Sequence, residues 1–197
     1  MESLFGRKKE RKPGGALVLY TTKHGATQRY AERIAQPLDA LVKEAAYAKL
    51  DQAKTYDAIV LGCPVYAGKL KGLDFFADNM AELKGKRLVL FTCGLYDPAQ
   101  TDVREGLDAE IRKALGDATE NVSVFHLRGA IRWNSLGLME RMLMKALLAQ
   151  VRKKEEAARS ETERLMLEAE GGALDFSDEA DLNPIVHAAR FGREADA

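Results

Sequence analysis

Short runs of consecutive apolar residues recur along the chain, separated by longer segments in which apolar positions are spaced as in helices. Runs that are almost continuously apolar are typical of parallel strands covered on both faces. We therefore predict strands over residues 16–20, 58–62, 88–91 and 122–125, and a weaker edge strand over 45–50. Only about seven residues separate 50 from 58, whereas a parallel crossover needs about a dozen. Either the helix between them is reduced to a turn, or the edge strand ends earlier.

Helical spacing of apolar residues predicts helices between the strands, over 27–41, 70–83 and 102–115. In the first of these, Tyr30, Ile34, Leu38 and Leu41 share one face. Strands that alternate with helices indicate an α/β protein with a doubly wound parallel sheet. We expect this domain to cover residues 16–191, between a flexible basic arm at 1–15 and a tail at 192–197.

The pattern changes after the last predicted strand, where we expect a helical insertion over about 134–172. The segment 136–151 carries an apolar stripe, and 152–170 is densely charged. Leucine and methionine at helical spacing favour an ordinary packing helix, although the stripe also suits an apolar ligand or a membrane surface. Asn183 followed by Pro184 predicts the cap and first residue of a closing helix.

Composition adds few constraints on function. The 30 basic and 30 acidic residues cancel, so no overall field favours nucleic acid. No apolar run is long enough to span a bilayer, which leaves at most peripheral membrane contact. The two cysteines, Cys63 and Cys93, lack metal-ligand spacing and suit a cytoplasmic protein. Because they end neighbouring strands they are either buried small residues, which we favour, or a redox pair.

Three loops follow predicted strands, at 21–27, 63–68 and 92–98, where open parallel sheets bind their ligands. The first leads directly into a helix, so its amide groups and the helix N-terminus can bind an anion. Thr22 and Thr27 add hydroxyl groups, Lys23 adds a charge, and Gly25 permits close approach of a phosphate. The loop has neither a dinucleotide-binding glycine pattern nor a triphosphatase motif.

The second and third loops each present a tyrosine, Tyr66 and Tyr96, beside small residues. A flat apolar ring between two such loops would gain stacking and burial, although both tyrosines could instead cap the sheet edge. With a phosphate-binding loop alongside, we favour the ring. No acidic pair follows the first strand, which excludes a response-regulator metal site, and no side chain is assigned as an acid or base catalyst.

The segments 17–27 and 56–68 resemble the phosphate loop and second flavin loop of the flavodoxin domain family. Together with the turn at 94–97 and the segment 128–131, they resemble the branch that includes bacterial menaquinone-dependent protoporphyrinogen oxidases. The resemblance implies a flavodoxin-like five-stranded sheet of order 2-1-3-4-5 with the insertion after its last strand, and FMN as cofactor. It implies FMN contacts from Thr22, Lys23, His24, Gly25, Ala26, Thr27, Pro64, Val65, Tyr66, Ala67, Gly68, Thr92, Gly94, Leu95 and Tyr96.

The resemblance also implies electron transfer or oxidoreduction through the bound flavin, with the Ala67–Gly68 peptide reorienting toward the reduced ring. The partner would be a redox protein or a small acceptor such as a quinone or porphyrinogen. One alternative is an enzyme like the menaquinone-dependent protoporphyrinogen oxidases. The other is a flavin-free module that binds a partner through the charged stretch at 152–170.

Overall fold

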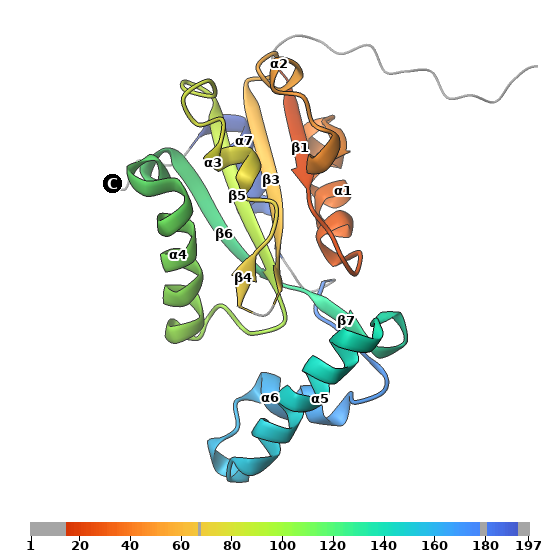
Figure 1. The fold of residues 1–197 in the computed structure, drawn as a ribbon. Coiled ribbons are helices and arrows are strands. Elements are labelled where there is room, and N and C mark those ends of the chain that lie inside the picture. The colour runs from red at the N-terminus through yellow and green to blue at the C-terminus, as the bar shows by residue number, and fades with distance from the viewer. Residues whose placement is uncertain (1–14, 67, 178–180, 193–197) are drawn as a thin grey trace, which may run out of the picture.

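The computed structural model describes residues 15–66, 68–177 and 181–192. A parallel sheet lies between helices, and a helical lobe packs below the edge at which its strands end (Figure 1). The basic arm and the tail predicted at the two ends fall almost entirely outside the described residues. The strands are β1 (Ala16–Tyr20), β2 (Leu41–Glu44), β3 (Ala58–Tyr66), β4 (Lys69–Leu70), β5 (Arg87–Gly94), β6 (Val122–Arg128), β7 (Ala130–Arg132) and β8 (Ala173–Asp175).

The main sheet has the order β2-β1-β3-β5-β6, with all of these strands parallel, and short β4 pairs with β3 in the antiparallel sense. Counted along the parallel strands alone, this is the predicted order 2-1-3-4-5. The α/β flavodoxin-like fold is therefore confirmed. Leu17 of β1 pairs with Ile59 of β3, which in turn pairs with Leu88 of β5, so these three strands run in step.

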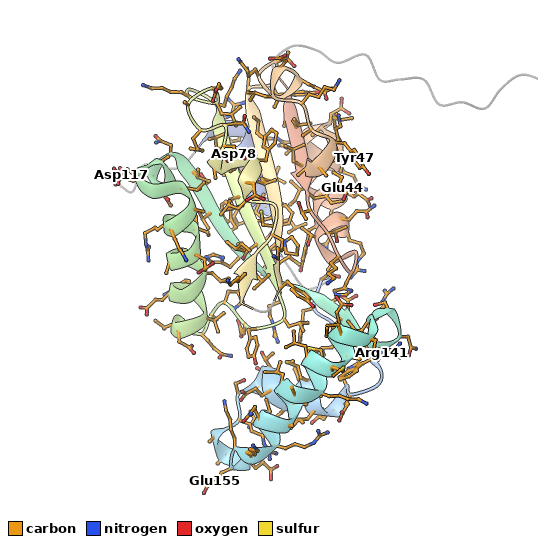
Figure 2. The ribbon with its side chains drawn as sticks, viewed as in Figure 1. Glu44, Tyr47, Asp78, Asp117, Arg141 and Glu155 are labelled. Carbon is orange, nitrogen blue, oxygen red and sulfur yellow. The ribbon has the colours of Figure 1, made fainter. Side chains whose placement is uncertain are left out.

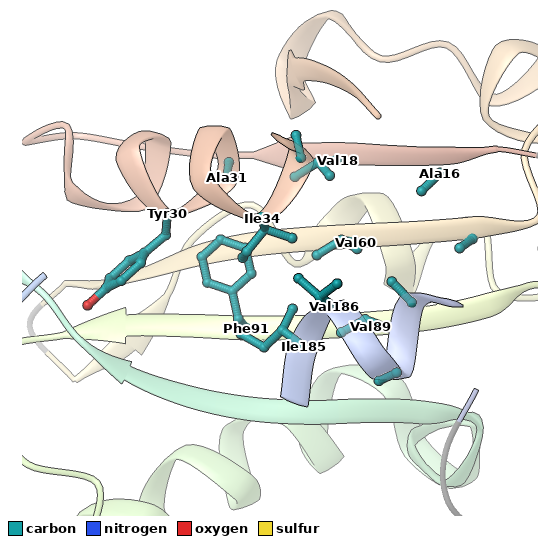
Figure 3. Close-up of a cluster of buried hydrophobic side chains, with 14 of the residues drawn as sticks. Ala16, Val18, Tyr30, Ala31, Ile34, Val60, Val89, Phe91, Ile185 and Val186 are labelled. Carbon is teal, nitrogen blue, oxygen red and sulfur yellow. The ribbon is translucent and has the colours of Figure 1, made fainter. Parts of the chain in front are cut away.

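Helices cover both faces of this sheet (Figure 1). On one face α1 and α7 bury Tyr30, Ile34 and Ile185 against Val60 and Phe91 (Figure 3). On the other, α3, α4 and the short α2 pack on alternate residues of the same strands. The helices are α1 (Ala26–Leu38), α2 (Leu50–Ala53), α3 (Asp74–Ala77), α4 (Thr101–Leu115), α5 (Leu138–Lys153), α6 (Glu161–Glu168) and α7 (Asn183–Phe191), with 3-10 turns at Ala45–Tyr47, Gly116–Asn121, Trp133–Ser135 and Glu156–Ala158.

The edge strand and the end of the first helix differ from the sequence-based prediction. Asp39 adopts a positive φ of 48°, which ends α1 before Leu41. Leu41 then begins β2, and the predicted strand over 45–50 is wrong, because 45–47 forms a 3-10 turn. The crossover to β3 therefore spans 45–57 and has the usual length, with its helix reduced to the four residues of α2.

The helix predicted over 70–83 is also mostly wrong. Lys69 and Leu70 continue a hairpin from β3, and only 74–77 is helical. Gly72 has a φ of 83°, a left-handed conformation that a right-handed helix cannot contain, and a Cβ at this turn would clash with the Thr21 side chain. The apolar residues Phe76 and Leu83 are nevertheless fully buried. The apolar pattern therefore predicted which residues are buried, although the backbone here is not the helix that the pattern also predicted.

The inserted lobe begins and ends with an antiparallel pair, β7 and β8, and contains α5 and α6. Arg29 of α1 binds Asp175 at 2.7 Å, and the backbone N–H of Phe176 donates to Gly129 at 3.1 Å. Arg128 lies 3.4 Å from the centre of the Phe176 ring. These contacts attach the base of the lobe to the sheet domain. Within the described ranges, no helix combines the length and apolarity needed to cross a bilayer.

The closing helix α7 starts one residue earlier than expected. Asn183 is its first residue and Pro184 its second, while the Asp181 carboxylate accepts a hydrogen bond from the Asn183 N–H at 2.9 Å. Asn183 is therefore not the cap.

Phe91 is fully buried and meets Tyr30 edge-on, with ring centres 6.3 Å apart. We predict that Phe91→Ala lowers the free energy of unfolding by about 3–5 kcal/mol, through lost burial and a residual cavity. Urea denaturation followed by circular dichroism measures the change. Tyr47→Ala is the control, because Tyr47, labelled in Figure 2, is an exposed residue. With 70% of its surface exposed, its loss should cost less than about 0.5 kcal/mol. Equal losses in the two variants would contradict the assignment of Phe91 to the core.

Candidate functional site

A cavity of about 600 Å³ lies where β1, β3 and β5 end, between the sheet and the inserted lobe. Its walls come from the loops after these strands, from α4 and the end of β6, and from α5 and α6 of the lobe. The parallel register carries all three loops to one edge of the sheet. Most of its exposed lining is apolar, and its polar side chains come from the first loop, from α4, from His126 and from Glu140.

Most of the predicted site residues line this cavity. The exceptions are Gly25 and Thr92, which are near it without lining it, and Ala67, which lies outside the described residues. The peptide reorientation assigned to Ala67–Gly68 stays a prediction, and Gly68 has a φ of 75°. The residues that line the cavity are Thr22, Lys23, His24, Ala26, Thr27, Pro64, Val65, Tyr66, Gly68, Gly94, Leu95 and Tyr96.

The first loop has the backbone geometry of an anion site. Gly25 has a φ of 84° and immediately precedes α1, whose first-turn amide groups have no acceptor within the helix. A Cβ on Gly25 would meet nothing within 4 Å, so open space lies beside the loop. The Gly25 N–H itself donates to the Thr22 hydroxyl oxygen at 3.0 Å, which holds the loop in its turn.

Lys23 connects this loop to two other parts of the site. Its ammonium nitrogen lies 2.5 Å from Oε1 of Glu140 on α5 and 4.0 Å from the centre of the Tyr66 ring. His24 Nε2 is 3.5 Å from the same carboxylate oxygen. Hydrogen bonding to Lys23, followed by the Gly137 amide, holds the pKa of Glu140 below its usual value, and the same ion pair raises the pKa of Lys23.

The second and third loops are held side by side by a close backbone approach. A Cβ on Gly94 would lie 3.1 Å from the Val65 side chain, so a residue larger than glycine would require Val65 to shift slightly. The Gly129 N–H donates to Gly94 at 2.6 Å and anchors the third loop to the end of β6. Tyr66 sits at the tip of the β3–β4 hairpin. Burial raises the pKa of Tyr96, and Glu163 of the lobe raises it further.

Sequence reasoning missed part of the cavity wall. His126 lines the cavity, with Nδ1 2.8 Å from the Thr92 hydroxyl and Nε2 3.1 Å from the Asp108 carboxylate. Its position opposite Thr92 depends on the register of β5 and β6. Glu140 was missed for a similar reason, because no local pattern relates α5 to the first loop.

The packing interpretation of the α5 stripe is only partly right. Leu148 and Val151 are buried, and Leu143, Met144 and Leu147 line the cavity. Leu136 is buried as well, whereas Leu138, Met139 and Met142 are 80%, 77% and 60% exposed and the lining residue Leu143 is 47% exposed. Trp133 packs within the lobe.

The two cysteines lie on opposite faces of the sheet, because residues opposite one another in neighbouring strands share a face and Cys63 pairs with Thr92 rather than Cys93. Cys63 packs toward α3, and Cys93 packs toward α1. Both are free thiols. The alternative of a redox pair is therefore wrong, and the interpretation as buried small residues holds.

Comparison with known proteins places this geometry in a family. The profile of the flavodoxin domain family matches residues 17–158, so the chain belongs to that family. Comparison with curated protein sequences gives no match. Among solved structures the chain is similar to two-electron reduced flavodoxin from Megasphaera elsdenii, with 21% identity over 57% of this chain and 85% of the other and a TM-score of 0.43. It is also similar to a Lactobacillus acidophilus flavoprotein in complex with FMN, with 17% identity, coverage of 58% and 93%, and a TM-score of 0.41.

Burial raises the pKa of the Cys93 thiol to about 11 and raises the pKa of Cys63 still more. We predict that neither thiol reacts within minutes with a disulfide reagent at pH 7.5 in the folded protein, because both thiolate fraction and access are low. Both thiols should react at once in about 6 M guanidinium, because this concentration unfolds all but hyperstable proteins. Absorbance of the released thiolate counts the groups. A thiol that reacts fast in the folded protein would contradict the burial of the cysteines. Fewer than two reactive thiols after unfolding without reductant would contradict their separation.

Proposed function

We propose that this protein binds FMN in the cavity at the carboxyl edge of the sheet and transfers electrons through it. The observation that carries the proposal is the convergence of an anion-binding loop and two tyrosine-bearing loops on one cavity. Membership of the flavodoxin domain family supports it. A volume of about 600 Å³ also falls within the range of ordinary cofactor pockets.

The residues present fit the two chemically different ends of FMN. The first-turn amides of α1, with the hydroxyl groups of Thr22 and Thr27, would hold the phosphate at a helix N-terminus. The loops carrying Tyr66 and Tyr96 would hold the flat ring, with Gly94 keeping the two loops close. When bound, FMN supplies one- or two-electron chemistry. The largely apolar lining excludes water and disfavours additional negative charge inside the cavity.

We predict that the purified protein quenches the fluorescence of added FMN, and that Tyr66→Ala and Tyr96→Ala each weaken FMN binding by about fivefold to tenfold. Loss of aromatic contact, worth about 1 kcal/mol, is the physical reason. Titration of FMN into the apoprotein gives the dissociation constants.

Tyr47→Ala again serves as the control, because Tyr47 is exposed and is not among the residues that line the cavity. The Tyr47→Ala variant should bind FMN with the same affinity as the unaltered protein. If folded, unaltered protein fails to quench FMN, the flavin-free binding module becomes the better description.

A small apolar electron acceptor is a second element of the proposal, favoured by the lobe's contribution to the cavity. Leu143, Met144 and Leu147 of α5 and Met166 of α6 form an apolar wall. A quinone or porphyrinogen could bind against it, which keeps the oxidase-like alternative open, whereas a simple electron carrier needs no such wall. The exposed apolar residues of α5, flanked by exposed Arg141 and Lys145, also suit peripheral contact with an anionic membrane.

We predict that Leu143→Gln slows reoxidation of the reduced, FMN-loaded protein by menadione about fivefold and leaves reoxidation by ferricyanide unchanged. A polar group on the wall weakens binding of an apolar acceptor but not of a hydrophilic one. Anaerobic stopped-flow absorbance measures both rates. Met139→Gln is the matched control, because Met139 is on the same helix, 77% exposed, and outside the lining. Equal rates in all three proteins would favour the simple electron carrier.

A further inference from the structure

One residue of the inserted lobe lies against the loop that would hold the cofactor's phosphate. Glu140 is in the first turn of α5, yet its Oε1 is 2.5 Å from Lys23 and 3.5 Å from His24. Its side chain is only 12% exposed. The lobe therefore places a carboxylate beside an expected anion site, where a carboxylate is electrostatically unfavourable for a second anion.

The position of this carboxylate is fixed by its own helix. The backbone N–H of Gly137 donates to Glu140 Oε2 at 2.8 Å, which is the glutamate half of a capping box, since Gly137 has no side chain to make the other half. Rotation of the side chain away from the first loop would remove this cap from α5. A ligand at the loop thus meets a carboxylate that cannot simply turn into solvent.

The ion pair with Glu140 also occupies Lys23, which carries the positive charge of the first loop. Lys23 is the lysine of the first loop, and the next cation on α1, Arg29, is bound to Asp175 at 2.7 Å. A phosphate bound at the amides of the loop has to share Lys23 with Glu140 or displace it. Riboflavin, which has the same ring but no phosphate, would not meet this competition.

We propose that Glu140 competes with the cofactor's phosphate for Lys23 and so sets the preference of the site between FMN and phosphate-free riboflavin. The inference rests on the proposed function, because it concerns the same flavin site. In this arrangement the inserted lobe weakens phosphate binding at the first loop and also builds the apolar wall of the same cavity.

The test is a pair of fluorescence-quenching titrations, one with FMN and one with riboflavin, on the apoprotein and on Glu140→Gln. Glutamine keeps a side-chain oxygen that can accept from Gly137 but removes the charge. We expect Glu140→Gln to bind FMN about fivefold more tightly, because the variant removes the repulsion between a partly exposed carboxylate and the phosphate. Riboflavin should bind with unchanged affinity. Circular dichroism checks that both proteins are folded.

Glu163→Gln is a matched control. Glu163 caps α6 through Ser160 at 2.9 Å and pairs with Lys154 at 2.7 Å, so it has the same two interactions away from the first loop. Its removal should leave the FMN-to-riboflavin affinity ratio unchanged. If Glu140→Gln leaves that ratio unchanged or shifts it toward riboflavin, the competition is refuted while FMN binding stands. If no protein binds either flavin, the proposed function and this inference both fail.

Discussion

The in-step parallel register of β1, β3 and β5 is the constraint on which the rest of the structure depends. These strands are buried on both faces, so a shift of one residue would turn apolar side chains from one core into the other. The register brings three separate loops to one edge, and the small Gly94 lets two of them touch. The site is therefore a consequence of core packing.

The lobe inserted after β6 turns this edge into a partly enclosed cavity. Its antiparallel base is attached through Arg29 and Asp175, and its first helix contacts the first loop on the lobe side of the site through Glu140 and Lys23. An open sheet edge would leave a ligand exposed on that side. Here the lobe supplies both an apolar wall and a charged contact, so ligand preference depends on two parts of the chain.

Helix α5 has two apolar surfaces with different environments. One lines the cavity, and the other, around Leu138, Met139 and Met142, is exposed beside basic side chains. A helix that only packed within the lobe would bury its leucines and methionines and expose polar residues. The continuity of these two surfaces is the structural basis for proposing an apolar acceptor or a membrane surface next to the flavin cavity.

The sequence by itself determined four of the five parallel strands and the loops that form the site, because continuous apolar runs and turn-rich strand ends are local signals, whereas the strand order followed from the resemblance to the flavodoxin domain family. It misplaced the edge strand, since the end of α1 depends on the left-handed conformation of Asp39. Only the tertiary structure separated Cys63 from Cys93, set His126 against Thr92 and brought Glu140 to Lys23. Register and packing between distant segments decide such contacts, and periodicity within one segment carries no information about them.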